Sequence, residues 1–172
     1  MPLFSCYKYS IMNEREVQHL ATQHLNRAHQ HQNEGRFGYA LRDYRRSIAV
    51  FPSPEAYLSL AAALGYLARY EEAIKECHHA IALDPDLGQP YHDIGTYLIE
   101  LRRWDQAKVW FELALNAPNY DRRCQAYYNL GRIHEYFGRF VDAMINYRTA
   151  LKDDPSYKDP KDMIMFLLAK AN

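Results

Sequence analysis

The sequence lacks an excess of charge of either sign, and it lacks long apolar runs. Its 21 Lys and Arg residues equal its 21 Asp and Glu residues, so the formal net charge is zero. Partners that bind through negative charge, such as nucleic acids and acidic membrane surfaces, usually select a basic excess. No apolar run approaches the roughly 20 residues of a membrane-spanning helix, and residues 1–11 make a poor signal peptide. We therefore expect neither a nucleic-acid nor a membrane partner.

Cysteine is scarce as well. The three residues, Cys6, Cys77 and Cys124, are far apart and include no C-x-x-C pair. This usage is typical of reduced, packed thiols rather than a disulfide framework or a zinc site, so we expect a cytoplasmic protein. Cys77 occupies a core position and should be buried. Cys124 opens a predicted helix, which would stabilise a thiolate, but no histidine and carboxylate can be assigned to it as catalytic partners.

The sequence also lacks the motifs of cofactor and metal sites. Gly35 and Gly38, and likewise Gly131 and Gly138, do not have the spacing of a nucleotide-binding loop. The four histidines near the N-terminus are separated by five, five and two residues, whereas metal ligands on one helix face need steps of three or four. We therefore predict no catalytic residues, no metal and no cofactor, and hence a protein that is not an enzyme.

What the sequence does contain is an internal repeat. A small residue is followed one helical turn later by a bulky or apolar one at four places: Ala40/Tyr44, Ala73/Cys77, Ala107/Phe111 and Ala143/Tyr147. The four alanines are 33, 34 and 36 residues apart. A second pattern precedes the last three pairs: Tyr57-x-x-Leu60-Ala61, Tyr91-x-x-Ile94-Gly95 and Tyr127-x-x-Leu130-Gly131. Pro52, Pro85 and Pro155 end helical stretches, because proline cannot continue a helix.

These spacings predict pairs of helices that pack closely. Apolar residues at three- and four-residue steps, as at Tyr91, Ile94 and Leu98, place one apolar face on a helix. Gly95 and Ala107 are small, so the two helices of a pair can approach each other there. Each helical hairpin alone exposes an apolar face, and stacking on its neighbours covers that face.

The pattern resembles the tetratricopeptide repeat over about residues 21–157. The resemblance implies an all-α fold, a right-handed superhelical stack of helix-turn-helix units known as an α-solenoid. The expected segments are a disordered tail at 1–13, repeats at 21–53, 54–87, 88–123 and 124–157, and a capping helix at 158–172. The expected helices are 14–33, 37–50, 54–67, 71–83, 88–101, 104–117, 121–137 and 140–152. Translation could begin at Met1 or at Met12.

Two places depart from the family pattern. His24, Arg27 and His31 occupy slots that are usually apolar, so the first helix is expected to be either a polar end cap or irregular. The link 117–123 carries about two residues more than a 34-residue period. We expect it to change the local stacking angle or to bulge outward.

The resemblance implies a protein-interaction module whose first helices line a concave groove. The expected peptide-binding residues are Tyr66, His92, Asp93, Thr96, Tyr128, Asn129, Arg132 and Tyr136. Arg132 is the main candidate, as a donor to an acidic or C-terminal group, unless Glu100 or Glu135 neutralises it. The lysines with which related co-chaperones clamp heat-shock proteins have no counterpart here. The alternatives are a plain structural spacer and an assembly subunit that oligomerises through its terminal helix, for example as a homodimer.

Overall fold

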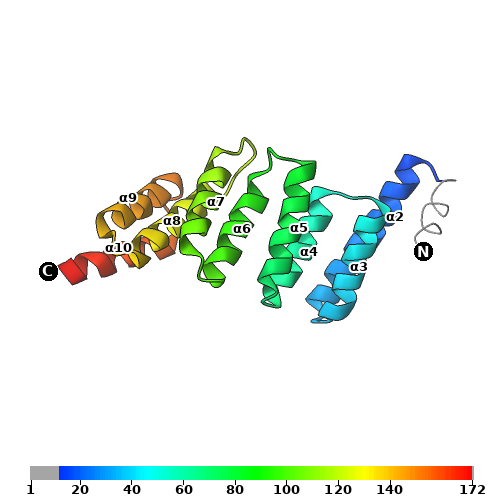
Figure 1. The fold of residues 1–172 in the computed structure, drawn as a ribbon, viewed down its shortest axis with the longest axis horizontal. Helices are drawn as coiled ribbons and strands as arrows, with labels where there is room; N and C mark the ends of the chain where they lie inside the picture. Colours follow the sequence, from blue (N-terminus) through cyan, green and yellow to red (C-terminus); the bar gives the residue numbers. More distant parts are fainter. Residues whose placement is uncertain (1–11, 172) are drawn as a thin grey trace. The chain divides into compact units, whose positions relative to one another are not determined.

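The computed structural model describes residues 12–171, and in this part of the chain all regular structure is helical (Figure 1). It divides into two compact units, residues 12–84 and 85–171. The first unit contains α2 (Glu14–Asn33), α3 (Phe37–Val50), α4 (Pro54–Tyr66) and α5 (Tyr70–Leu83). The second contains α6 (Gly88–Glu100), α7 (Trp104–Asn116), α8 (Arg123–Tyr136), α9 (Phe140–Asp153) and α10 (Lys158–Ala171). Each helix begins and ends within about two residues of its predicted bounds.

Local sequence explains where several helices begin. Asn13, which the sequence analysis placed in the tail, caps α2 by accepting a hydrogen bond from the Glu16 backbone, and Glu16 reciprocates. Ser53 caps α4 through its side chain alone, which accepts a hydrogen bond from the Ala56 N–H, and Pro54 lies in the first turn. The rest of the expected tail, residues 1–11, lies outside the described residues, as does the choice between Met1 and Met12.

The turns inside the hairpins need a left-handed residue after the first helix. Glycine supplies it at Gly35 (φ 73°) and at Gly138 (φ 71°). In the other two hairpins the same conformation falls on Ala68 (φ 56°) and Arg102 (φ 61°). A side chain makes this conformation less favourable.

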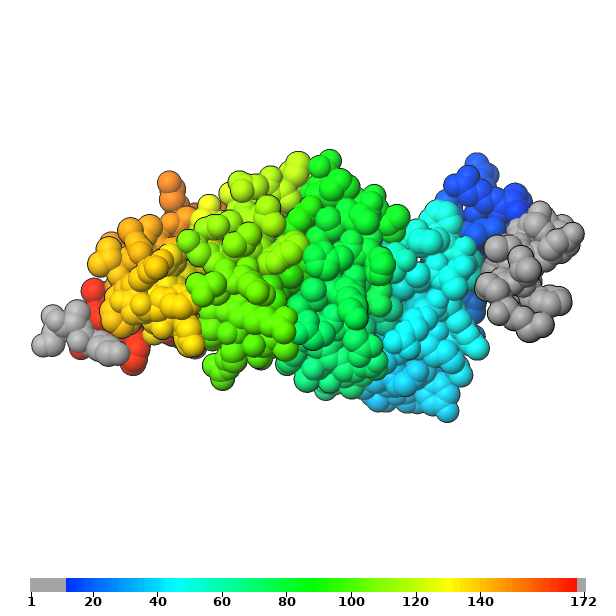
Figure 2. All heavy atoms as spheres, viewed as in Figure 1, coloured from blue at the N-terminus to red at the C-terminus, as the bar shows by residue number. Residues whose placement is uncertain are grey.

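Small residues let the paired helices of the second unit approach closely. A Cβ atom at Gly95 would lie 2.9 Å from the Phe111 ring, and one at Gly131 would lie 2.4 Å from the Tyr147 ring. Phe111 and Tyr147 are fully buried. The predicted role of the two glycines in close packing is therefore confirmed. In the space-filling view of Figure 2, the atoms of successive segments lie directly against one another within each unit.

The terminal helix packs on the last hairpin. Leu167 of α10 joins Ala143 and Tyr147 of α9 in a buried cluster, and Met163 and Ile164 pack against its edge. This contact covers part of the apolar face of α9, which is the capping role expected for the helix.

The first hairpin is polar but regular. α2 is a continuous helix of 20 residues, so the irregular alternative is wrong. Arg27 from this helix binds the buried Asp43 of α3.

The link 117–123 does not bulge outward. Asn119 pairs with Leu87 in an isolated parallel bridge, in which Gly88 N–H donates to the Asn119 carbonyl (2.8 Å). Tyr120 lies against Gly88, where a Cβ would come within 2.3 Å of the tyrosine Cβ. The extra residues therefore fold back onto the start of α6.

Candidate functional site

Seven of the eight predicted binding residues lie in the second unit, and the structure separates them into two groups. Tyr128, Arg132 and Tyr136 follow one another by single turns along one side of α8. His92, Asp93 and Thr96 belong to α6. Tyr66 stands apart at the end of α4 in the first unit, where its exposed ring stacks on Phe37 (centroids 4.6 Å apart).

The α8 group lines a cavity of about 370 Å³, named the α8 pocket here. Its walls are Trp104, Tyr128, Arg132, Glu135, Tyr136 and Met163. Three helices of the same unit contribute: the first residue of α7, one side of α8, and α10. Trp104 and Met163 were not among the expected binding residues. The position of Trp104 at the start of α7 could have indicated its place in the pocket. The repeat pattern does not predict that the terminal helix contributes a lining residue.

Arg132 is the cation of the α8 pocket. Its Nη1 donates to the Asn129 side-chain oxygen (3.2 Å), and its guanidinium carbon lies 5.9 Å from the centre of the Tyr128 ring. Asn129 is itself buried, so it positions the arginine rather than offering a contact of its own. The guanidinium has five N–H donors in all. Most of them stay available to a ligand.

The predicted neutralisation of Arg132 is not seen. The Glu135 carboxylate lines the same pocket but accepts a hydrogen bond from the Tyr147 hydroxyl (2.8 Å). Within residues 12–171, no carboxylate lies within ion-pairing distance of Arg132. The α8 pocket therefore presents a cation whose charge is not cancelled by a contact.

Aromatic rings form the rim of the α8 pocket. Tyr136 is 57% exposed and stacks on Trp104 with ring centroids 4.4 Å apart and planes 16° apart. Tyr128 is only partly exposed, because its ring packs near Tyr147 (5.8 Å) and Tyr157 (5.5 Å). Tyr136 is thus the more accessible aromatic residue, while Tyr128 also supports the cap. Stacked aromatic rings beside an arginine suit a peptide side chain or backbone.

His92 does not face a groove as the repeat phase predicted. It is 5% exposed, packs edge-on against Phe111 (5.1 Å), and places Nδ1 2.6 Å from the Tyr120 hydroxyl. That hydroxyl donates its single proton to the Arg122 carbonyl (2.8 Å), so Nδ1 must carry the proton of the histidine contact. Burial, helped by the Arg122 charge, lowers the pKa of His92 to about 3. The ring is therefore neutral and ties the link to α6.

Asp93 and Thr96 also have partners inside the unit. Arg122 donates to the Asp93 carboxylate (3.2 Å), and burial raises the pKa of Asp93 despite that positive charge. The Thr96 hydroxyl donates to the His92 carbonyl (3.1 Å). Asp93 and His92 therefore secure the 117–123 link, whereas the hydrogen bond of Thr96 stays within α6. None of the three residues lines the α8 pocket.

Cys77 and Cys124 are the two thiols within residues 12–171. Cys77 is fully buried, as predicted. The pKa of Cys124 is raised, first by burial and then by Asp154 and Asp153, so the expected thiolate stabilisation at the start of α8 is wrong. In residues 12–171 no three His, Cys, Asp or Glu side chains gather closely enough to hold a metal ion. None of the helices in that range has the length and hydropathy needed to cross a bilayer.

Comparison with known proteins identifies the repeats. The tetratricopeptide-repeat family matches residues 54–87 and 125–157, and the other two hairpins have the same helical arrangement. The chain contains tetratricopeptide repeats. An uncharacterised protein of Haemophilus influenzae is 35% identical over 60 residues, which are 35% of this chain and 34% of that protein. The chain thus spans about a third of that relative.

Solved structures share the fold. A Pseudomonas aeruginosa PilF structure has a TM-score of 0.81 at 18% identity and covers 91% of this chain and 71% of that one. The second TPR domain of Spaghetti (RPAP3), solved with the HSP90 peptide SRMEEVD, has a TM-score of 0.55 at 28% identity, with 59% and 95% covered. The fold class of this tetratricopeptide-repeat protein is therefore all-α, an α-solenoid of helical hairpins.

Proposed function

We propose that this tetratricopeptide-repeat protein is a non-catalytic adaptor that binds a peptide segment of a partner protein at the α8 pocket. The carrying observation is the Arg132 guanidinium, which stands in that pocket between aromatic residues without a carboxylate contact among residues 12–171. Arginine binds carboxylates through two parallel hydrogen bonds. An acidic side chain or a C-terminal carboxylate is the group we expect there.

The other predicted binding residues have different roles in this proposal. Tyr136 and Tyr128 would contact the peptide directly, and Asn129 would position Arg132. Tyr66 would belong to a separate contact on the first unit. His92 and Asp93 would act indirectly, by holding the 117–123 link, and Thr96 would act only through its own helix. A cytoplasmic location, and the absence of nucleic-acid and membrane partners, belong to the same proposal.

The RPAP3 domain supports peptide binding as a use of this fold, because its structure contains an acidic peptide from HSP90. The clamp positions of this chain lack lysine, so we do not propose that peptide as its ligand. A single arginine with stacked aromatic rings is a different recognition surface.

The test begins with a partner captured on the purified protein and identified by mass spectrometry. Arg132→Ala and Tyr136→Ala should each weaken binding of that partner by about tenfold or more if they are hot spots. Arg132→Lys keeps the charge but removes the planar fork and should also weaken it. Arg148→Ala is the matched control, because this exposed arginine of α9 lies outside the α8 pocket. Wild-type affinity for both the Arg132 and Tyr136 variants would refute the proposal.

The second candidate is assembly through the terminal helix. Met165, Phe166 and Leu168 of α10 are 67%, 54% and 45% exposed, which is unusual for adjacent apolar side chains on one helix. Light scattering over a range of protein concentrations distinguishes the two functions. A dimer that dissociates in Phe166→Ser would favour assembly, whereas a monomer throughout would exclude self-association.

A further inference from the structure

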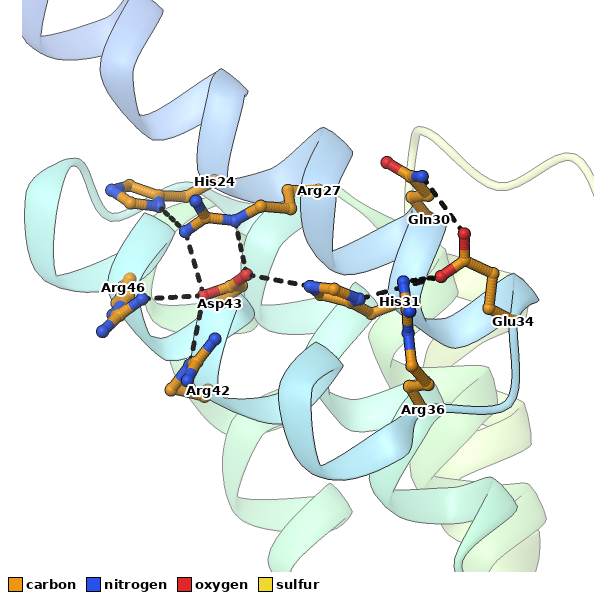
Figure 3. Close-up of polar contacts among 9 residues, drawn as sticks. All are labelled: His24, Arg27, Gln30, His31, Glu34, Arg36, Arg42, Asp43 and Arg46. Carbon is orange, nitrogen blue, oxygen red and sulfur yellow. Dashed lines mark hydrogen bonds and ion pairs between the residues drawn. The ribbon is translucent and has the colours of Figure 1, made fainter.

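A second cluster of charges lies on the α2–α3 hairpin, far in sequence from the α8 pocket. Asp43 is fully buried, and three arginines approach its carboxylate (Figure 3). Arg27 binds it with two nitrogens: Nε donates to Oδ2 (2.6 Å) and Nη2 to Oδ1 (3.1 Å). Arg46 Nη1 donates to Oδ1 (3.1 Å), and Arg42 Nε lies 3.5 Å from the same oxygen. One carboxylate therefore organises three guanidinium groups.

The charges of this cluster do not cancel. Burial acts to raise the pKa of Asp43, but the Arg27 hydrogen bond and the three arginine charges outweigh it and hold that pKa below its usual range. Asp43 therefore carries one negative charge at neutral pH against three positive ones. His24 adds none, because burial and then Arg27 lower its pKa. A surplus of positive charge is left at the surface.

The nearby ion pair does not remove this surplus. Glu34 is engaged by Arg36 and by the Gln30 side chain. His31 lies between the two groups, 3.7 Å from Asp43 and 3.9 Å from Glu34 (Figure 3). Glu34 and Arg36 form a neutral pair, so the excess belongs to the arginines around Asp43.

The arginines have more donors than Asp43 can use. A carboxylate has about four acceptor sites, and an arginine has five N–H donors. The two hydrogen bonds from Arg27 already satisfy much of Asp43. Arg42 and Arg46 each direct one nitrogen at it, while their side chains are 49% and 50% exposed. Their other N–H groups face solvent, while the contact with Asp43 restricts the motion of both side chains. This restriction reduces the conformational entropy that they lose when they bind a ligand.

An exposed aromatic ring adjoins these donors. The Arg42 guanidinium lies 5.0 Å from the centre of the Tyr39 ring, and Tyr39 is 53% exposed. Arginine and tyrosine together are enriched at the energetic centres of protein interfaces. This composition favours a protein ligand over a bare inorganic ion.

We propose that Arg42, Arg46 and Tyr39 form a second docking site, which binds an acidic segment of a partner protein through a carboxylate or phosphate group held between the two guanidinium groups. A nucleic acid fits less well, because the whole chain has zero net charge and the Glu34 carboxylate lies beside the cluster. The site shares no residue with the α8 pocket, so it can be tested separately from the proposed function.

Fluorescence anisotropy with three labelled peptides tests this site on the full chain. The probes are a glutamate-rich peptide, the same peptide with one phosphoserine, and a version with glutamine in place of every acidic residue. Both acidic probes should bind at low ionic strength and weaken with added salt, whereas the glutamine probe should not bind. Tighter binding of the phosphoserine probe would assign the site to phosphate, and equal binding would assign it to carboxylates.

The decisive variant is Arg42→Gln with Arg46→Gln. Asp43 keeps both hydrogen bonds from Arg27, so the fold should be retained, and acidic-peptide affinity should fall by about tenfold. Arg45→Gln removes the same charge from the same helix, but Arg45 acts on Glu72 instead, and it should change affinity by less than about twofold. If the double variant melts early, Arg42→Gln alone, with its long 3.5 Å contact, replaces it. An equal loss in Arg45→Gln, no binding of either acidic probe, or stronger binding of oligothymidylate would overturn the proposal.

Discussion

Asp43 in the first unit and His92 in the second are both buried ionisable side chains, and their surroundings favour opposite charge states. Asp43 has three arginines within 3.5 Å or less, so it stays ionised. His92 has the Phe111 ring and the Tyr120 hydroxyl as neighbours, so it stays neutral. Desolvation disfavours both charged forms. The difference shows that partners supplied from the neighbouring helix or link decide the charge state.

The same comparison holds for two equivalent core tyrosines. The Tyr44 hydroxyl donates to the Gln32 side chain (2.8 Å), and the Tyr147 hydroxyl donates to the Glu135 side chain at the same distance. Both donors lie 12 residues after their acceptors. The repeat therefore conserves the geometry inside the molecule while the charge of the acceptor changes. In the second unit this hydrogen bond engages the carboxylate of Glu135, which lines the α8 pocket together with Arg132.

At neutral pH the largest effect should come from Gly95→Leu, which disturbs the apolar packing next to His92. The new side chain would displace the Phe111 ring, since even a Cβ would approach it to 2.9 Å. We expect a loss of about 3 kcal/mol in the free energy of unfolding, measured by urea denaturation. Gly38→Ala is the control, because nothing lies within 4 Å of its added Cβ. Equal midpoints for the two variants would contradict the packing described here.

Acid should next destabilise the protein through His92. The folded pKa of about 3 lies below the unfolded value of about 6.5, so the unfolded chain binds the proton first. The stabilisation is complete above pH about 6.5 and declines by up to ~1.4 kcal/mol per pH unit toward the folded pKa. Urea midpoints at several pH values should show this slope. It should flatten in His92→Asn, and an unchanged slope would show that His92 is protonated or exposed in the folded state.

Asp43→Asn should have an intermediate effect. Removing one partner of a buried ion pair typically costs ~3–5 kcal/mol, but the arginines here are about half exposed, so we expect about 2 kcal/mol. The folded pKa of Asp43 is lowered, so its contribution is present above the unfolded pKa of about 3.9 and disappears as pH falls through the folded value. The difference in unfolding free energy between wild type and variant should therefore shrink below pH about 4. A difference that persists there would mean that charge is not its source.

The sequence predicts the helices of both units, but it does not predict the surroundings of Asp43 and His92. Helix bounds and the packing of Gly95 on Phe111 follow from spacing alone, because each repeat buries the same face. His92 was placed in a groove because the repeat phase ignores the 117–123 link, whose Tyr120 buries it. The cluster around Asp43 joins residues 16 positions apart, and the polar slots at His24, Arg27 and His31 were its only signal. The Met163 wall of the α8 pocket depends on how α10 docks, which no repeat pattern specifies.

The turn positions could have been predicted, and they give the smallest effect in each unit. Aligning the hairpins puts Ala68 and Arg102 in the slots that Gly35 and Gly138 fill, and both adopt left-handed φ values of 56° and 61°. Glycine adopts the left-handed conformation without strain, and it also increases the conformational entropy of the unfolded chain. We expect the stabilisation from the lost strain to exceed the destabilisation from this entropy. Ala68→Gly in the first unit and Arg102→Gly in the second should each raise the free energy of unfolding by about 0.5–1 kcal/mol. The reverse changes, Gly35→Ala and Gly138→Ala, should lower it by a similar amount. Urea midpoints measured on the four variants test these expectations. A loss of stability in both Ala68→Gly and Arg102→Gly would show that the entropy of the unfolded chain outweighs the strain of the left-handed conformation.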